Sequence, residues 1–136
     1  MTTPIRDLAA LLATLQPEAR PGTWAWCSLP DGGLPAGVDA VATLREAEGL
    51  TVVVSEEVAI ARGWPVAFRA AWLTLRVHSD LEAVGLTAAV ARVLAEAGIA
   101  CNVIAGVHHD HLFVPVGRAQ DALQALRTLQ EAAARP

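Results

Sequence analysis

The sequence predicts an α+β fold made of two similar units, each with helices on one face of a small antiparallel sheet. Two observations indicate this class. Stretches in which apolar and polar residues alternate, as in half-buried strands, are followed by stretches with the three-to-four-residue apolar spacing of helices. After Pro17 the order is strand, loop, strand, strand, helix, and then strand, helix, strand, strand, helix. The second group repeats the plan of the first, which indicates an internal duplication.

Length and composition limit the protein class. A chain of 136 residues suits one compact domain or two small units sharing a core. Hydrophobic residues make up 54% and charged residues 18%, which supports a core and argues against disorder. The net charge of −4 and the lack of a basic run argue against a nucleic-acid partner. With no apolar run near the ~20 residues of a membrane span and no secretory signal, we expect a cytoplasmic protein.

The first unit opens with a short amphipathic helix over residues 5–15, which Pro17 ends. A strand over Thr23–Leu29 follows. Its residues Trp24 and Trp26 lie on one face. We expect this face to pack under a helix, because large aromatic side chains in strands are mostly buried, and the alternative is that they line a pocket.

The loop Pro30–Asp39 stands where the first unit would carry a helix, and its Gly and Pro residues exclude one. Val41–Glu46 and Leu50–Val54 then form a predicted hairpin. Ser55 has the side chain of a helix N-cap, so a short helix is expected to begin there.

The second unit begins with a predicted strand over Trp72–His78. Ser79 and Glu82 have the spacing of a capping box, so the next helix is expected over residues 82–97, with Gly98 as its stop. Two strands, Ile99–Ala105 and Leu112–Val116, and a final helix over Arg118–Glu131 complete the unit. This pattern is that of a ferredoxin-like split βαβ unit.

Each unit of ~60 residues is marginal by itself, so two units that join their sheets are expected to stabilise one another. We place the N-terminal unit at residues 1–66 and the C-terminal unit at residues 67–136.

Gly85 lies inside the expected helix, where glycine costs ~1 kcal/mol relative to alanine. Either the regular helix begins after it, or something requires a backbone without a side chain there. We favour the second explanation.

These residues carry a family likeness. The step Val84-Gly85-Leu86 after a Ser/Asp bend, and Asn102-Val103-Ile104 after a helix that ends in Leu-Ala-Glu-Ala-Gly-Ile, resemble the ACT domain, an amino-acid-sensing module of many metabolic enzymes. This segment is similar to the regulatory domains of aspartate kinases. The whole chain resembles small stand-alone bacterial proteins with two ACT units, related in plan to the cytosolic arginine sensors of animals.

The resemblance implies a non-catalytic regulatory module that binds a free amino acid at the strand-to-helix bend, and we expect a homodimer or a closed pseudo-dimer. It implies no cofactor. It also implies a further partner, a metabolic enzyme or a regulator. Because the Pro30–Asp39 loop replaces the bend and helix of the first unit, we expect one main site per chain. The ligand-binding residues that the resemblance implies are His78, Ser79, Asp80, Leu81, Val84, Gly85, Leu86, Asn102, Val103 and Ile104.

The chemistry of these residues agrees with that placement. A helix N-terminus suits an α-carboxylate, and Asp80 or Glu82 could pair with an α-ammonium group. Each residue also has a purely structural explanation: Ser79 and Glu82 as caps, Asn102 at a strand end, and His78 as an ordinary strand-end residue.

His108, His109, Asp110 and His111 form the one metal-like cluster, but adjacent side chains of a strand point to opposite sides. We therefore interpret the segment as a turn in which Asp110 caps neighbouring backbone groups. The sequence shows no GxSxG, Walker or GxGxxG motif. Two other hypotheses remain beside the sensor: an adaptor for a partner protein whose ligand site has decayed, and a metal-dependent enzyme that uses His108–His111.

Overall fold

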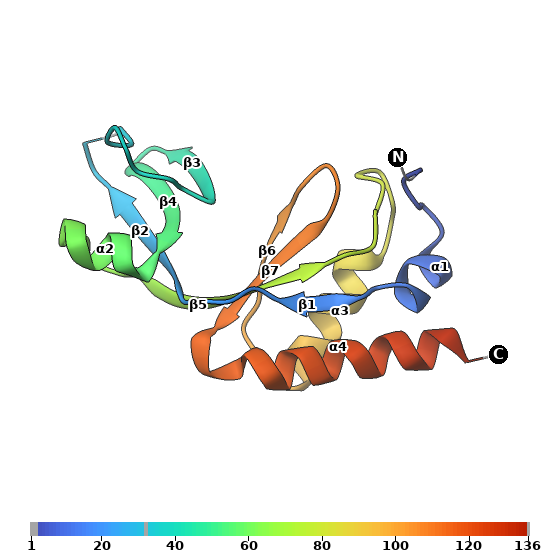
Figure 1. The fold of residues 1–136 in the computed structure, drawn as a ribbon. Coiled ribbons are helices and arrows are strands. Elements are labelled where there is room, and N and C mark those ends of the chain that lie inside the picture. The colour runs from blue at the N-terminus through green and yellow to red at the C-terminus, as the bar shows by residue number, and fades with distance from the viewer. Residues whose placement is uncertain (1–2, 32, 136) are drawn as a thin grey trace. The chain divides into compact units, whose positions relative to one another are not determined.

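The computed structural model describes residues 3–31 and 33–135, and these form two compact units. The first, here called the insert unit, comprises residues 21–70 without residue 32. The second, the terminal unit, combines residues 3–20 with residues 71–135 (Figure 1). The α+β class, with helices on one face of antiparallel strand pairs, is as predicted from the sequence.

Strand β5 (Phe68–Leu75) contains the boundary between the two units, so each unit uses one half of it. The units predicted at residues 1–66 and 67–136 were defined by the repeat in the sequence, so their bounds differ from those of the insert and terminal units. They remain a prediction.

The insert unit has the strand order β3-β4-β2-β5. Its elements are β2 (Trp24–Leu29), β3 (Ala42–Glu46), β4 (Gly49–Ser55) and α2 (Glu56–Arg62). The hairpin and the helix agree with the sequence prediction. Ser55 caps α2 by accepting from the Val58 N–H at 3.4 Å, and Gly63 ends the helix in the left-handed conformation.

The two tryptophans of β2 do not pack under α2, and that prediction is wrong. The opposite face of the strand, Ala25, Cys27 and Leu29, forms the core of the insert unit together with Ala59 of α2. Small side chains allow a short helix to approach the sheet closely, which the large indole rings would prevent. The ring of Trp26 instead contacts Phe68 edge to face, with the centroids 6.2 Å apart.

The terminal unit has the strand order β1-β5-β7-β6. Its elements besides β5 are α1 (Leu8–Ala13), β1 (Pro17–Ala19), α3 (Leu86–Glu96), β6 (Asn102–Ala105), β7 (Asp110–Pro115), the 3₁₀ turn η1 (Val116–Arg118) and α4 (Ala119–Ala134). Both α3 and α4 lie on the same side of this sheet (Figure 1). Strand β1 pairs with the end of β5 and was not foreseen.

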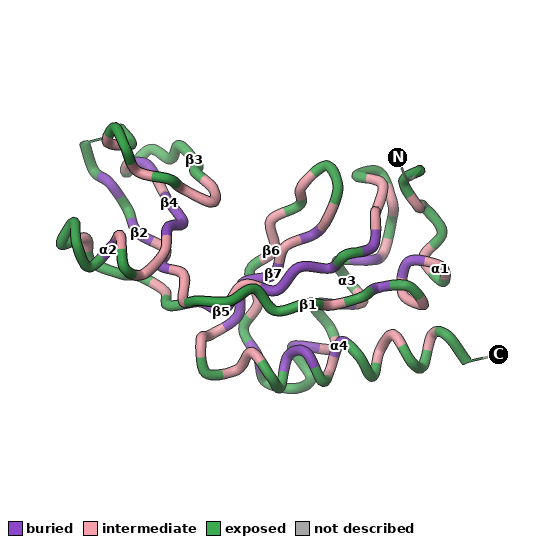
Figure 2. Tube along the Cα trace, viewed as in Figure 1, coloured by how far each residue is buried: buried purple, intermediate pink, exposed green. Residues whose placement is uncertain are grey.

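The core of the terminal unit lies between its sheet and its helices. Buried residues run along β7 and along one side of α4 (Figure 2). Leu73 and Leu75 of β5 belong to this core together with Val90 and Leu94 of α3, as the alternation in the sequence predicts. Among the described residues, no helix combines the length and apolar character that a membrane span requires.

The second unit departs from prediction at its strand-to-helix connection. Strand β5 ends at Leu75 instead of His78, and α3 begins at Leu86 instead of residue 82. Residues 76–85 therefore form a connection in which residues 76–78 and 82–85 had been expected to be regular structure, and it contains most of the predicted site.

Candidate functional site

The first feature of the site is the N-terminus of α3. Gly85 is the N-cap of this helix, with φ 105° and ψ −19°, and no side chain in the described part of the chain caps the helix. Helix N-termini leave main-chain N–H groups without an intrahelical partner and carry partial positive charge. The first turn of α3 can therefore hold an anionic group such as a carboxylate.

Both explanations offered for Gly85 are borne out in part. The regular helix does begin after it, and the positive φ also disfavours any side chain at this position.

The bend, residues 78–85, takes its shape from Asp80 and not from a capping box. The Oδ1 atom of Asp80 accepts from the Glu82 N–H at 2.8 Å, and its carbonyl oxygen accepts from the Ala83 N–H at 2.9 Å. Ser79 donates to the Asp80 carbonyl oxygen at 3.4 Å and does not cap α3. The predicted capping box of Ser79 and Glu82 is wrong, because the helix begins well beyond both residues.

Asp110 was predicted to lie in a turn, but it is the first residue of strand β7. It is only 9% exposed and does not act as a turn cap. The turn before it is closed by main-chain atoms instead, with the Gly106 N–H donating to the His109 carbonyl oxygen at 2.9 Å. Burial raises the pKa of the Asp110 carboxyl group, and a hydrogen bond with Ser79 and the charge of His109 partly oppose this rise.

A sequence signal for this burial existed. Asp110, Leu112 and Val114 alternate along β7, and the two apolar members belong to the core face, so the aspartate belongs there too.

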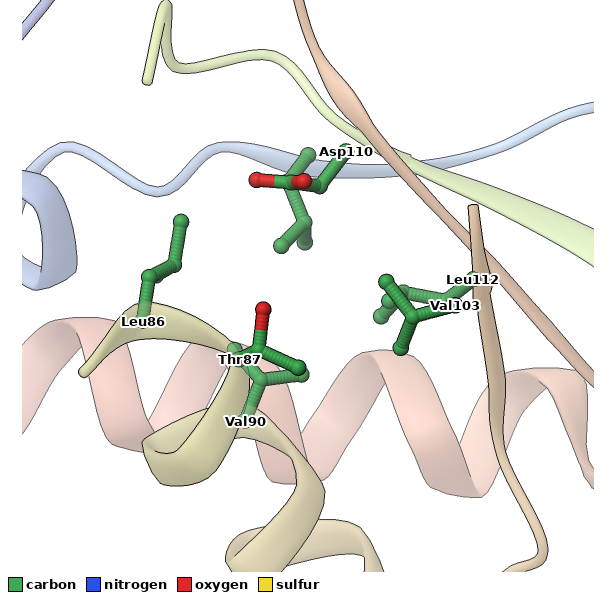
Figure 3. A pocket seen from close by; sticks show the side chains of 7 residues that line it. Leu86, Thr87, Val90, Val103, Asp110 and Leu112 are labelled. Atoms are coloured by element: carbon green, nitrogen blue, oxygen red, sulfur yellow. The ribbon is translucent and has the colours of Figure 1, made fainter. Parts of the chain in front are cut away.

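A narrow crevice separates the start of α3 from the sheet, and Asp110 lies at its upper edge (Figure 3). Leu86, Thr87 and Val90 of α3 line one side, and the sheet supplies the other. The sheet residues are Leu75, Val103, Asp110 and Leu112. The crevice is too narrow for a water molecule as it stands, so a ligand side chain would have to separate its walls.

The chain's own N-terminal segment covers the bend, which the sequence did not suggest. The Ile5 N–H donates to the His78 carbonyl oxygen at 2.8 Å, and the Asp80 N–H donates to the Ile5 carbonyl oxygen at 2.9 Å. Arg6 forms ion pairs with Asp80 at 3.3 Å and with Glu82 at 2.9 Å.

The three predicted ligand-binding residues of β6 lie on two different faces of the strand. Val103 packs against the core and lines the crevice beside Asp110. Asn102 and Ile104 lie on the opposite face of the strand, where they pair in register with Phe113 and His111. The structure thus brings Val103 to the bend but places Asn102 and Ile104 on the other side of the sheet.

The remaining predicted residues surround the bend. Leu81 is 62% and Val84 84% exposed. The ring of His78 contacts that of His108 with the centroids 5.6 Å apart, so the hairpin turn before β7 lies beside the bend. No group of three His, Cys, Asp or Glu residues among those described is placed to hold a metal ion.

The loop of the insert unit that replaces a helix borders a wider hollow of about 320 Å³. Prolines and Trp64 line much of it, together with Ser28 and Asp31. It has no helix N-terminus to hold a carboxylate, because the described residues between β2 and β3, 30–31 and 33–41, form no helix. The bend therefore remains the better candidate for an amino-acid site.

Comparisons with known proteins support a repeated small domain. Two sequence profiles, both described as ACT domain, match residues 3–71 and residues 68–128. A search of the curated proteins found no match. Among solved structures, a Vibrio cholerae protein of unknown function, described as a possible transport protein, is 44% identical with a TM-score of 0.81, over 90% of this chain and 95% of that one.

Two more distant structures share the fold. A protein from Agrobacterium tumefaciens is 19% identical with a TM-score of 0.63, over 80% of this chain and 84% of that one. The regulatory subunit of aspartate kinase from Thermus flavus is 11% identical with a TM-score of 0.57, over 83% of this chain and 95% of that one.

Proposed function

The chain belongs to the ACT domain family with two units in tandem, and on that premise we propose that it is a non-catalytic regulatory module that binds a free amino acid at the bend. ACT domains are regulatory, and the regulatory subunit of aspartate kinase shares the fold. The observation that carries the proposal is the N-terminus of α3, which begins at Leu86 after the N-cap Gly85 and has no side-chain cap among the described residues.

The two charged ends of an amino acid find complementary groups around the bend. The α-carboxylate would accept from the first main-chain N–H groups of α3. The α-ammonium group would pair with Asp80, whose side chain is 26% exposed, or with the buried carboxylate of Asp110. A ligand side chain would enter the apolar crevice between α3 and the sheet after its walls separate.

A second copy of the chain belongs to this proposal. Strand β6 pairs only with β7 among the described strands and forms an edge of the terminal sheet. An unpaired edge favours pairing with another strand. We propose that a homodimer covers this edge, with Asn102 and Ile104 as contact residues.

Backbone amide spectra of the ¹⁵N-labelled protein, titrated with each of the twenty L-amino acids, test the site. The proposal predicts that one or a few of them shift the amide resonances of residues 85–88. The start of α2, where Ser55 caps the helix, is a control whose amides stay unchanged. Shifts confined to other regions would contradict the proposed site.

The adaptor function remains the second candidate because apolar side chains are exposed around the bend. Leu81, Val84 and, on the neighbouring hairpin turn, Val107 are 62%, 84% and 67% exposed. Such side chains suit contact with a partner protein. This alternative predicts an unchanged spectrum with all twenty amino acids.

A further inference from the structure

The N-terminal segment that crosses the bend, residues 4–6, is here called the strap. Its main chain lies parallel to the bend and forms a bridge between Ile5 and Ser79. Two hydrogen bonds hold it, from the Ile5 N–H to the His78 carbonyl oxygen at 2.8 Å and from the Asp80 N–H to the Ile5 carbonyl oxygen at 2.9 Å. The strap thus occupies the main-chain groups with which the bend could recognise a ligand.

The side chains next to these bonds occupy the same region. Arg6 forms ion pairs with Asp80 at 3.3 Å and with Glu82 at 2.9 Å, so it neutralises the carboxylates that would attract an ammonium group. Leu8, the first residue of α1, lies so close to Gly85 that a Cβ atom there would approach Leu8 Cδ2 to 2.9 Å. The space above the glycine backbone is therefore filled from within the chain.

We propose that the strap is an intramolecular competitor for the bend and that a bound amino acid displaces it. The inference rests on the proposed function, since it concerns regulation of the same site. The strap and the ligand compete for the Asp80 carboxylate, which pairs with Arg6 in the free protein. The main-chain bonds of Ile5 to His78 and Asp80 hold the strap across the same bend. Ligand binding is then coupled to release of the N-terminal segment, which becomes free to contact another molecule.

The structure allows this release without unfolding the terminal unit. Leu11 and Leu15 are completely buried and anchor α1 and the residues that follow it to the core. Asp7 caps α1 by accepting from the Ala10 N–H at 2.9 Å, so the helix can keep its first turn when the strap leaves. The ion pairs of the strap contribute little, because Arg6 is 61% exposed and ion pairs in water are weak. Its main-chain hydrogen bonds and the partly buried Ile5 side chain are then the contacts that a ligand must displace.

Calorimetric titration of the full chain with each of the twenty L-amino acids tests the inference, with two variants that weaken the strap in different ways. Arg6→Ala removes both ion pairs. Ile5→Pro removes the N–H donor to His78 and the Ile5 side chain that packs against the core, but keeps the Arg6 side chain. Arg76→Ala is the matched control, because it removes an exposed ion pair with Glu18 in the same unit. We expect both strap variants to bind the same amino acid about twofold to thirtyfold more tightly than the wild type, and the control to bind it equally.

Hydrogen exchange supplies the second measurement. The Ile5 amide is protected by its bond to His78 in the free protein, and we expect it to exchange faster when the wild type is saturated with that amino acid. Binding to the wild type with unchanged Ile5 exchange, and with equal affinity in both strap variants, would overturn the strap inference alone. The absence of binding in every variant would overturn the proposed function and the strap inference together.

Discussion

Leu8 lies directly over Gly85, and a Cβ atom built on that glycine would come within 2.9 Å of Leu8 Cδ2. The two residues belong to α1 and to the N-cap of α3, which are far apart in the sequence. Gly85 also has a φ of 105°, a conformation that side chains rarely adopt. The backbone conformation therefore favours glycine at the end of the bend, and an added side chain would also force Leu8 to move.

Replacement of Gly85 by alanine is expected to lower the free energy of unfolding by about 2–3 kcal/mol. Gly98→Ala is the matched control, because Gly98 also has a positive φ, 71°, but no atom lies within 4 Å of its Cβ position. The control is expected to lose only about 1–2 kcal/mol, the strain of the left-handed conformation. Urea unfolding of both variants measures the difference, and equal losses would contradict the packing role of Leu8.

Leu8→Ala combined with Gly85→Ala separates strain from contact. If the added methyl group collides with Leu8, the double variant should be about 0.5–1 kcal/mol more stable than the sum of the single effects predicts. Additive effects would assign the whole cost at Gly85 to its backbone conformation.

Ser55→Ala tests the cap of α2. The Ser55 hydroxyl oxygen accepts from the Val58 N–H at 3.4 Å, so its loss should cost about 1 kcal/mol of stability. Ser28→Ala, at an exposed position of the neighbouring strand β2, should change stability by less than about 0.5 kcal/mol. Chemical denaturation with tryptophan fluorescence measures both, and a cap variant as stable as the wild type would refute the assignment.

Asp110→Asn should change how stability depends on pH. Burial raises the pKa of Asp110 in the folded protein above that of the unfolded chain, about 3.9. The folded protein therefore binds more protons between these two pKa values, and the free energy of unfolding falls as pH rises above about 4. The variant lacks this titration, so it should gain stability relative to the wild type across that window. A stability difference that stays constant with pH would contradict the raised pKa.

His111 should produce the opposite dependence. The Trp72 indole N–H donates to His111 Nδ1 at 3.0 Å, and burial, the charge of Arg20 and that of His109 lower the pKa of His111. The unfolded chain then binds more protons, so stability is lost as pH falls below about 6.5. His111→Gln keeps an acceptor for Trp72 and should lose less stability than the wild type on acidification. Parallel curves for the two proteins would argue against this role.

The sequence predicted the regular elements well because their signals are local. The alternation in β2 and β4, the Ser55 cap and the Gly63 stop each depend on residues within a few positions of one another. The paired units could be recognised because the order of elements repeats.

The bend was predicted less well because its shape depends on distant residues. Ile5 forms main-chain hydrogen bonds with His78 and Asp80, and Leu8 fills the space above Gly85. No local sequence pattern reveals these contacts. The capping box had the right spacing but failed, because Asp80 turns the chain with its own side chain and delays the helix. Asp110 was misplaced because the turn composition of its neighbours outweighed the alternation along β7.

The central claim is that the bend binds a free amino acid through both of its charged ends. The most direct measurement is calorimetric titration of the wild type with the twenty L-amino acids, repeated with the carboxamide of each one that binds. We predict saturable binding of one or a few of them, a stabilisation of about 2.7 kcal/mol at a hundredfold excess over Kd, and at least about tenfold weaker binding of the carboxamide, which lacks the anion for α3. The absence of binding with all twenty, in a folded protein, would contradict the claim.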